Sequence, residues 1–222
     1  MSNETTLDGP SQPEPVVIEW NAMAHYHNRL DQIEADVDAA LQDGRPRLVL
    51  LGDSISEGHP AKEIAGFRVV NMGISGDKIA MEPDGGVLRR LDVVARAKPA
   101  HVFLMVGVND FWHTPPKPVA DAKADYSKLA EALANALPDS KLWMLSTFPT
   151  AGNHADFNPL VKELNERVRA QAELHGTEYV DLHPVLADPK GELRTEFTSD
   201  GIHLTPQGYD AWTSEMERLL NG

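Results

Sequence analysis

Residues 48–58 have the sequence LVLLGDSISEG, and this stretch decides the fold. Its first four residues are apolar, and a short apolar run bounded by turn-forming residues is typical of a buried β-strand. Gly52 and Asp53 follow at once and predict a turn. We therefore expect Ser54 at the carboxyl end of a buried strand, with its hydroxyl presented above a sheet.

Similar apolar runs recur along the chain and alternate with segments of helical period. The further runs are residues 69–72, 102–106, 142–145 and 179–182. Apolar residues recur at three- and four-residue spacing in residues 21–41, 87–95, 119–137, 159–174 and 206–220. Strands that alternate with helices favour a parallel sheet with helices on both faces. The predicted fold class is α/β, with a five-stranded parallel sheet at its centre.

The length of 222 residues fits one domain with one core. Residues 1–15 are polar and hold three of the 16 prolines, a composition that favours a flexible N-terminal arm. The prediction is therefore a single folded domain over residues 16–222, with one site.

Charge and composition exclude several classes of partner. The chain has 34 acidic against 20 basic residues, a net charge of −14, which repels phosphate backbones and anionic lipid headgroups. It has no cysteine, so thiol nucleophiles and thiolate metal sites are excluded. No histidine spacing favours a metal site, and we expect no cofactor. Neither a signal peptide nor a membrane span is apparent, so we expect a cytoplasmic protein without membrane insertion. The sequence leaves a homo-oligomer open.

Two loops carry the residue types of a hydrolytic nucleophile and its base. Active sites of parallel sheets gather beyond the carboxyl ends of the strands, which is where Ser54 is expected. Asp200 and His203 stand three residues apart in a late loop, close enough for the carboxylate to fix the imidazole tautomer. Capping and packing roles are the alternative for each residue taken alone. The α/β-hydrolase elbow G-x-S-x-G is not met, because Ser56 stands where its second glycine belongs.

Two further loops carry hydrogen-bond donors suited to an oxyanion. Gly73 and Gly76 follow the second strand, and glycine lets a backbone N–H approach a ligand closely. Asn109 follows the third strand, and a side-chain amide donates to an oxyanion as a backbone N–H does. A turn glycine and a capping asparagine are the alternatives. Together the four loops supply a nucleophile, a base, an acid and oxyanion donors.

The order of these four blocks resembles that of the SGNH, or GDSL-type, hydrolases. The blocks are Gly52-Asp53-Ser54, Gly76, Gly107-x-Asn109-Asp110 and Asp200-x-x-His203, and they spread from about residue 48 to 209. The N-terminal helix and the run at 191–200 look like the small branch of platelet-activating-factor acetylhydrolase-like and carbohydrate O-acetylesterase-like proteins.

The resemblance implies a flavodoxin-like three-layer α/β/α fold, no metal, and hydrolysis of small carboxylic esters through an acyl-enzyme. By the resemblance, Ser54 attacks, His203 takes its proton and Asp200 orients His203. The oxyanion is then met by the backbone N–H groups of Ser54 and Gly76 and by the Asn109 amide. Ile55 stands where leucine is commoner in the family, a buried exchange that leaves the chemistry untouched.

The neighbouring residues give weaker indications about the substrate. Phe111 and Trp112 follow Asn109 and are candidates for the substrate pocket, with packing under the loop as the alternative. Asp53 adjoins the nucleophile and is a further pocket candidate, the alternative being that it holds the loop through backbone N–H groups. The expected activity is that of a short-chain esterase that removes acetyl groups from a carbohydrate or from a small phospholipid. A lysophospholipase or acyl-thioesterase and a non-catalytic binding protein on the same fold are the alternatives.

Overall fold

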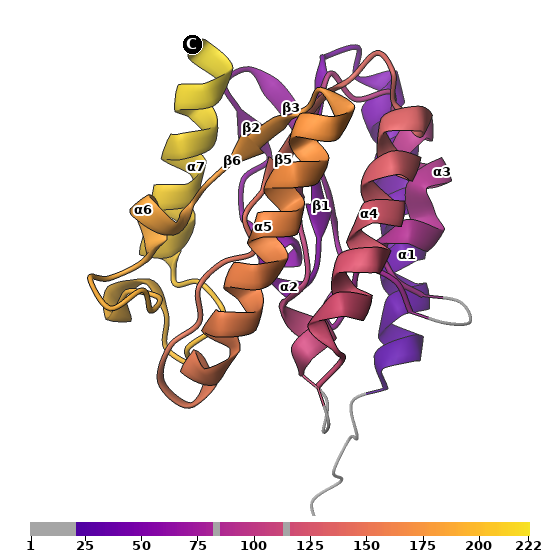
Figure 1. Cartoon of the computed structure of the whole chain (residues 1–222). Helices are drawn as coiled ribbons and strands as arrows, with labels where there is room; N and C mark the ends of the chain where they lie inside the picture. The colour runs from indigo at the N-terminus through magenta and orange to yellow at the C-terminus, as the bar shows by residue number, and fades with distance from the viewer. Residues whose placement is uncertain (1–20, 82–84, 113–115) are drawn as a thin grey trace, which may run out of the picture.

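The computed structural model describes residues 21–81, 85–112 and 116–222, so the predicted arm over residues 1–15 lies outside the described residues. The described residues form an α/β structure around one sheet, drawn in Figure 1. Its strands are β1 Arg47–Gly52, β2 Glu63–Ile64, β3 Phe67–Gly73, β4 His101–Met105, β5 Lys141–Leu145 and β6 Glu178–Val180.

The strand order is β2-β3-β1-β4-β5-β6. All neighbouring pairs are parallel except β2 and β3, so the five predicted parallel strands are confirmed. Their order is that of flavodoxin-like sheets, in which ligands bind at the switch point between β1 and β4.

The sheet has one strand more than predicted. The extra strand β2 is only two residues long and pairs with β3 through the turn at Ala65 and Gly66, both of which have positive φ. A two-residue strand has no detectable alternation, which explains why the sequence pattern did not indicate it.

The helices match the predicted helical segments closely, with one division. Residues 87–95 were expected to form one helix and instead form a 3₁₀ turn followed by a short α-helix, because Arg90 leaves helical geometry between them. The α-helices are α1 Ala22–Gln42, α2 Ser54–Glu57, α3 Leu91–Arg96, α4 Val119–Ala136, α5 Asn158–His175, α6 His183–Leu186 and α7 Pro206–Asn221. The 3₁₀ helices are η1 Val87–Arg90, η2 Val108–Phe111, η3 Gly152–Phe157 and η4 Thr195–Phe197.

Successive residues of each strand point to opposite faces of the sheet and build two cores. In β1, Val49 and Leu51 join a core with α1, α3, α4 and α5. Leu48 and Leu50 join the opposite core, which contains side chains of α2, α6 and α7. Figure 1 shows α7 at the left of the strands and α4 at their right, with α5 passing in front of them. The three-layer arrangement predicted from the sequence is therefore confirmed.

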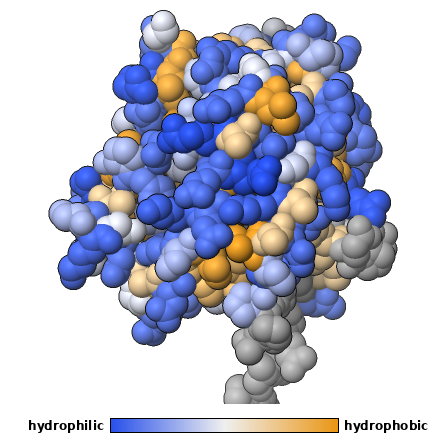
Figure 2. Space-filling model, in the orientation of Figure 1, coloured by the Kyte–Doolittle hydropathy of each residue, from blue (hydrophilic) through white to orange (hydrophobic). Residues whose placement is uncertain are grey.

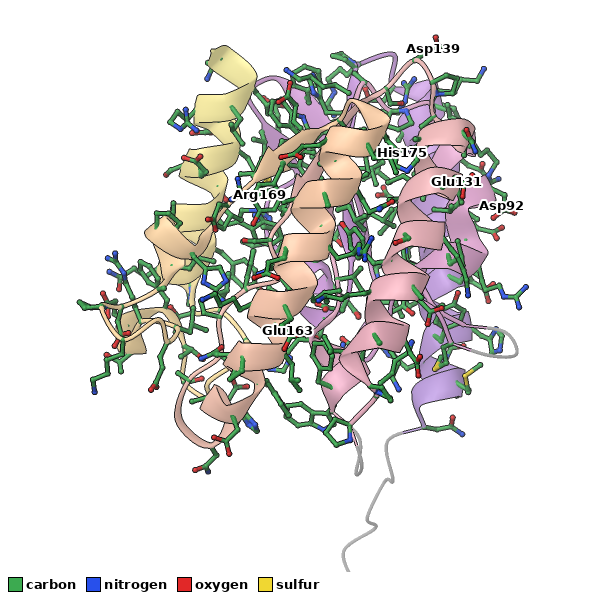
Figure 3. The ribbon with its side chains drawn as sticks, viewed as in Figure 1. Asp92, Glu131, Asp139, Glu163, Arg169 and His175 are labelled. Atoms are coloured by element: carbon green, nitrogen blue, oxygen red, sulfur yellow. The ribbon has the colours of Figure 1, made fainter. Side chains whose placement is uncertain are left out.

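The outer surface of the front helices is polar. Figure 2 shows a mostly hydrophilic face with apolar residues in small separate groups. Asp92, Glu131, Glu163 and Arg169, labelled in Figure 3, lie on α3, α4 and α5. Within the described residues, no helix is long and apolar enough to cross a membrane.

Candidate active site

Ser54 is the first residue of α2, directly beyond the carboxyl end of β1. The Asp53 carboxylate caps this helix by accepting a hydrogen bond from the Ile55 N–H at 3.0 Å. The carboxyl ends of the strands point toward the bottom of the view in Figure 1, where α2 follows β1. Since β1 lies between β3 and β4, the Ser54 hydroxyl is placed at the switch point of the sheet.

The structure brings Ser54 together with the predicted base and acid. His203 Nε2 lies 3.0 Å from Ser54 Oγ, and His203 Nδ1 lies 2.7 Å from Asp200 Oδ2. The three side chains therefore form one hydrogen-bonded chain in the order nucleophile, base and acid. This geometry requires the loop around residue 200 to return to the edge of the sheet. It does so because the Ala151 N–H donates to the Gly201 carbonyl at 2.8 Å.

The Asp200 carboxylate is held from two sides. Its Oδ1 accepts hydrogen bonds from the backbone N–H groups of Ile202 at 2.9 Å and His203 at 2.8 Å, and from the Thr198 hydroxyl at 3.3 Å. Burial raises the pKa of Asp200, but the hydrogen bonds from the His203 ring and from these backbone groups outweigh it and lower the pKa to about 2. Asp200 is therefore ionised at neutral pH and free to orient the imidazole.

The predicted oxyanion donors lie at the ends of adjacent strands. Gly76 follows β3 with φ +80°, a conformation that favours glycine, and Asn109 lies in η2 beyond β4. One N–H of the Asn109 amide is held by the Asp77 carbonyl at 2.9 Å, which leaves the other for a ligand. No described residue accepts a hydrogen bond from the backbone N–H of Ser54 or of Gly76. These three donors therefore have unused capacity at the edge where Ser54 stands.

A buried ion pair, which no sequence pattern indicated, lies beneath this edge. Arg90 Nη2 is 2.7 Å from Asp77 Oδ2, and the two side chains are 2% and 0% exposed. Arg90 also donates to the carbonyls of Met72 and Gly52, at the ends of β3 and β1. One guanidinium thus ties together the two strand ends and the residue whose carbonyl holds Asn109.

Asp110 has its own partners and supports the loop rather than a ligand. Its Oδ2 accepts a hydrogen bond from the Ile79 N–H at 3.0 Å, and its Oδ1 accepts one from Lys117 Nζ at 2.9 Å. Burial raises the pKa of Asp110, although these bonds act in the opposite direction. The carboxylate links η2 to the segment after β3.

The pocket candidates differ in exposure. Phe111 is 0% exposed and belongs to the core under η2, and the Asp53 side chain is likewise 0% exposed, so neither reaches the surface. Trp112 is 49% exposed and packs against His154 and Phe157, with ring centroids 4.7 and 5.7 Å away. Of the three candidates, Trp112 alone presents a surface to an incoming substrate.

A flavodoxin-like sheet with a Ser–His–Asp chain at its carboxyl edge defines a serine hydrolase. Comparison with known families gives the particular one: residues 50–211 match the GDSL-like lipase/acylhydrolase family. The chain belongs to this family and is an ester-cleaving hydrolase, as the four sequence blocks predicted. Across residues 21–81, 85–112 and 116–222, no group of three or more His, Asp or Glu side chains is arranged to hold a metal ion.

Solved structures of related proteins have the same fold. A GDSL-like lipase from Bacteroides thetaiotaomicron VPI-5482 is 25% identical with a TM-score of 0.69, over 89% of this chain and 98% of that one. A candidate platelet activating factor from Streptococcus pneumonia is 24% identical with a TM-score of 0.69, over 90% of this chain and 100% of that one. The carbohydrate acetylesterase Est24 from Sinorhizobium meliloti is 16% identical with a TM-score of 0.62, over 79% of this chain and 98% of that one.

One relative of known function is similar over most of this chain. The N-acylneuraminate cytidylyltransferase of Escherichia coli O18:K1:H7 is 24% identical over 199 residues, which cover 87% of this chain and 44% of the relative. The chain thus spans less than half the length of this relative.

Proposed function

We propose that this protein hydrolyses short-chain carboxylic esters, acetyl esters first among them, through an acyl-enzyme on Ser54. The observation that carries the proposal is the hydrogen-bonded chain from Ser54 Oγ to His203 Nε2 at 3.0 Å and from His203 Nδ1 to Asp200 at 2.7 Å. A hydroxyl is a weak nucleophile until a neighbouring base accepts its proton, and this chain supplies that base.

The proposed reaction has two steps, and His203 acts in both. In the first, Ser54 Oγ attacks the ester carbonyl carbon while its proton passes to His203 Nε2. The bond to the alcohol oxygen then breaks, and His203 returns the proton to the departing alcohol. In the second step a water molecule gives a proton to His203 Nε2 and attacks the acyl carbon. The bond to Ser54 Oγ then breaks, and His203 returns the proton to Ser54 Oγ as the carboxylic acid leaves.

The negative charge that develops on the carbonyl oxygen in each step needs donors that are already in place. Ser54 N–H, Gly76 N–H and the Asn109 amide are proposed to meet it. All three lie in the short segments that follow β1, β3 and β4, so the donors are in place before the charge forms.

The preference for a short acyl group rests on the wall beside the site. Trp112 extends the Asn109 loop, and His154 lies next to Gly201 in the catalytic loop, since a Cβ on Gly201 would be 3.5 Å from its ring. The Trp112 and His154 rings pack against each other with their centroids 4.7 Å apart, which joins the two loops in one wall. Such a wall favours an acetyl group, and the exposed indole suits a sugar ring on the alcohol side. A carbohydrate O-acetylesterase is the form of the activity that we propose.

The first experiment tests the nucleophile. The wild-type protein should turn over p-nitrophenyl acetate, and Ser54→Ala should lower kcat by about 10⁶-fold, as in serine hydrolases that lose the nucleophile. A fluorophosphonate should label Ser54 and no other serine. Ser214→Ala, which alters an exposed serine of α7, is the matched control and should keep full activity. An active, folded Ser54→Ala protein would contradict the proposal.

The second experiment tests acyl length with p-nitrophenyl esters. A pocket that accepts a longer chain gains about 0.8 kcal/mol per buried methylene, or about fourfold in kcat/KM for each carbon. A short-acyl enzyme should instead lose activity beyond butyrate. A steady rise from acetate to decanoate would favour the lysophospholipase or thioesterase alternative, and acetylated sugars in the same panel test the alcohol group.

A further inference from the structure

The last residue of α2, Glu57, reaches the loop that carries Gly76. Glu57 Oε2 accepts hydrogen bonds from both the backbone N–H and the hydroxyl of Ser75, the latter at 2.7 Å. Ser54 and Glu57 lie one helical turn apart in the same short helix. The helix that begins with the nucleophile therefore ends on a carboxylate that holds the neighbouring oxyanion loop.

Helix α1 supports this carboxylate from its other side. His25 Nε2 lies 3.1 Å from Glu57 Oε2, and Arg29 Nε lies 3.7 Å from Glu57 Oε1. Burial raises the pKa of Glu57, but the hydrogen bonds from Ser75 and His25 outweigh it and leave the pKa below its ordinary value. Glu57 is therefore a carboxylate at neutral pH, the stronger acceptor for the two Ser75 donors.

The backbone of α2 packs directly on the end of β3. A Cβ at Gly73 would lie 2.0 Å from the Glu57 nitrogen, so no side chain fits at that position. The Asn71 side chain donates to the Ser56 carbonyl at 2.7 Å, which adds a second link between α2 and β3. The backbone of Glu57 is therefore held in place against β3, which positions its side chain to hold Ser75.

The loop that it holds is a turn whose central peptide carries the Gly76 N–H. The Asp77 N–H donates to the Ile74 carbonyl at 3.0 Å, and Gly76 has φ +80° whereas Ser75 is not among the residues with positive φ. These are the features of a type II turn, with glycine in its third position. A type I turn differs by a reversal of the central peptide, and glycine accommodates both. The direction of the Gly76 N–H thus depends on which turn the loop adopts.

We infer that Glu57 is a positioning residue for the oxyanion hole: by holding both donors of Ser75, it keeps the Gly76 N–H directed toward the carbonyl oxygen of an ester bound at Ser54. This inference rests on the proposed function. Glu57 touches no reacting atom, and it acts on the transition state through the Ser75–Gly76 peptide.

Steady-state kinetics with p-nitrophenyl acetate tests the inference. Glu57→Ala should lower kcat by about 10²-fold, the order expected for a misplaced oxyanion donor, with KM within about twofold. The kcat of Glu57→Gln should lie between those of wild type and Glu57→Ala, because the glutamine amide oxygen still accepts a hydrogen bond from the Ser75 N–H. Ser75→Ala removes one of the two bonds and should cost about three- to tenfold in kcat. Glu63→Gln, an exposed residue that pairs with Arg45, is the matched control and should behave as wild type.

A second measurement distinguishes positioning from a general structural role. A trifluoromethyl ketone adds to the serine and forms an oxyanion, so its inhibition constant should rise in Glu57→Ala by the same factor as kcat/KM falls. If Glu57→Ala does not fold, Glu57→Gln and Ser75→Ala carry the same comparison.

The failure of this inference is distinguishable from that of the proposed function. An active wild-type enzyme whose Glu57 variants keep kcat and ketone affinity, or lose only KM, would overturn the inference and leave the esterase intact. A wild-type protein with no turnover and no Ser54 labelling would overturn both.

Discussion

The two halves of the candidate site are built in opposite ways. Asp200 and His203 are 51% and 52% exposed, and apart from the contact of His203 with Ser54, the bonds of their side chains come from residues at most three positions away. On the oxyanion side, Asp77 and Arg90 are 0% and 2% exposed and are joined to strand ends far along the chain. The predicted acid and base thus lie in an exposed loop, whereas the predicted oxyanion donors are supported by buried residues of the core. Changes in the first should affect rate alone, and changes in the second should also affect folding.

Among the changes that compare these two halves, Asp200→Asn should have the largest effect. An asparagine keeps the shape but no longer fixes the His203 tautomer, and the comparable change in a serine protease costs about 10⁴ in kcat. Because both side chains are exposed, the midpoint of thermal unfolding should stay near that of wild type. Asp181→Asn is the matched control, since that exposed carboxylate also caps a backbone N–H, that of His183, at 3.0 Å. A rate close to wild type in Asp200→Asn would contradict the assigned triad.

Arg90→Met tests the other half. It leaves the Asp77 carboxylate buried without its partner, and breaking a buried ion pair in this way costs about 3–5 kcal/mol. The free energy of unfolding, measured with urea, should fall by that amount. Arg96→Met removes a guanidinium that is 41% exposed and should cost less than about 1 kcal/mol. Equal losses of unfolding free energy in Arg90→Met and Arg96→Met would show that the buried ion pair contributes no more to stability than an exposed one.

Asp53 makes the buried half sensitive to pH. Burial raises the pKa of its carboxyl from the ordinary 3.8 to about 7, despite the hydrogen bond from Ile55 and the nearby His203. Between about pH 4 and pH 7 the folded protein therefore keeps a proton that the unfolded chain has lost, so stability falls as pH rises through this window. At about 1.4 kcal/mol per pKa unit, the loss is about 4 kcal/mol at most.

Asp53→Asn should remove this dependence. The asparagine oxygen still accepts from the Ile55 N–H, so the helix cap is kept while the titration is lost. From pH 4 to pH 7 the free energy of unfolding of wild type should fall relative to that of Asp53→Asn. Above pH 7 the difference between the two proteins should stay constant. If the free energies of unfolding of the two proteins changed in parallel with pH, Asp53 would not be the group that titrates.

Asn109→Ala should affect both the reaction rate and the stability of the fold. Loss of one oxyanion donor costs about 10²–10³ in kcat, with KM nearly unchanged, because the contact is made only in the transition state. The side chain also holds the Asp77 carbonyl, so a small loss of stability should accompany the loss of rate. Asn153→Ala, at an exposed position of η3, is the control. A rise in KM at constant kcat would instead make Asn109 a substrate-binding residue.

The same contrast explains what the sequence could predict. The Asp200–His203 pair is visible because its partners stand three residues apart, and the five parallel strands are visible because each is an apolar run bounded by turns. Arg90 and Asp77 stand 13 residues apart, so their spacing in the sequence matched no motif. Glu57 lies within residues 48–58, but it meets Ser75 only because α2 packs closely on Gly73. Phe111 is likewise buried because of the path of η2, which the sequence pattern did not predict.

The smallest effect is expected within the exposed loop itself. The Thr198 hydroxyl donates to Asp200 Oδ1 at 3.3 Å and accepts from the Gly201 N–H at 2.8 Å, so it joins both ends of the turn that holds the acid. Thr198→Val keeps the shape and removes both bonds. Hydrogen bonds of this kind contribute about 0.5–1.5 kcal/mol, so kcat should fall by about two- to tenfold with the unfolding midpoint almost unchanged. Thr177→Val, which removes a hydroxyl at the amino end of β6, is the control and should leave kcat unaltered. A loss in Thr198→Val as large as that in Asp200→Asn would mean that the acid is held by this one hydroxyl rather than by the backbone N–H groups of Ile202 and His203.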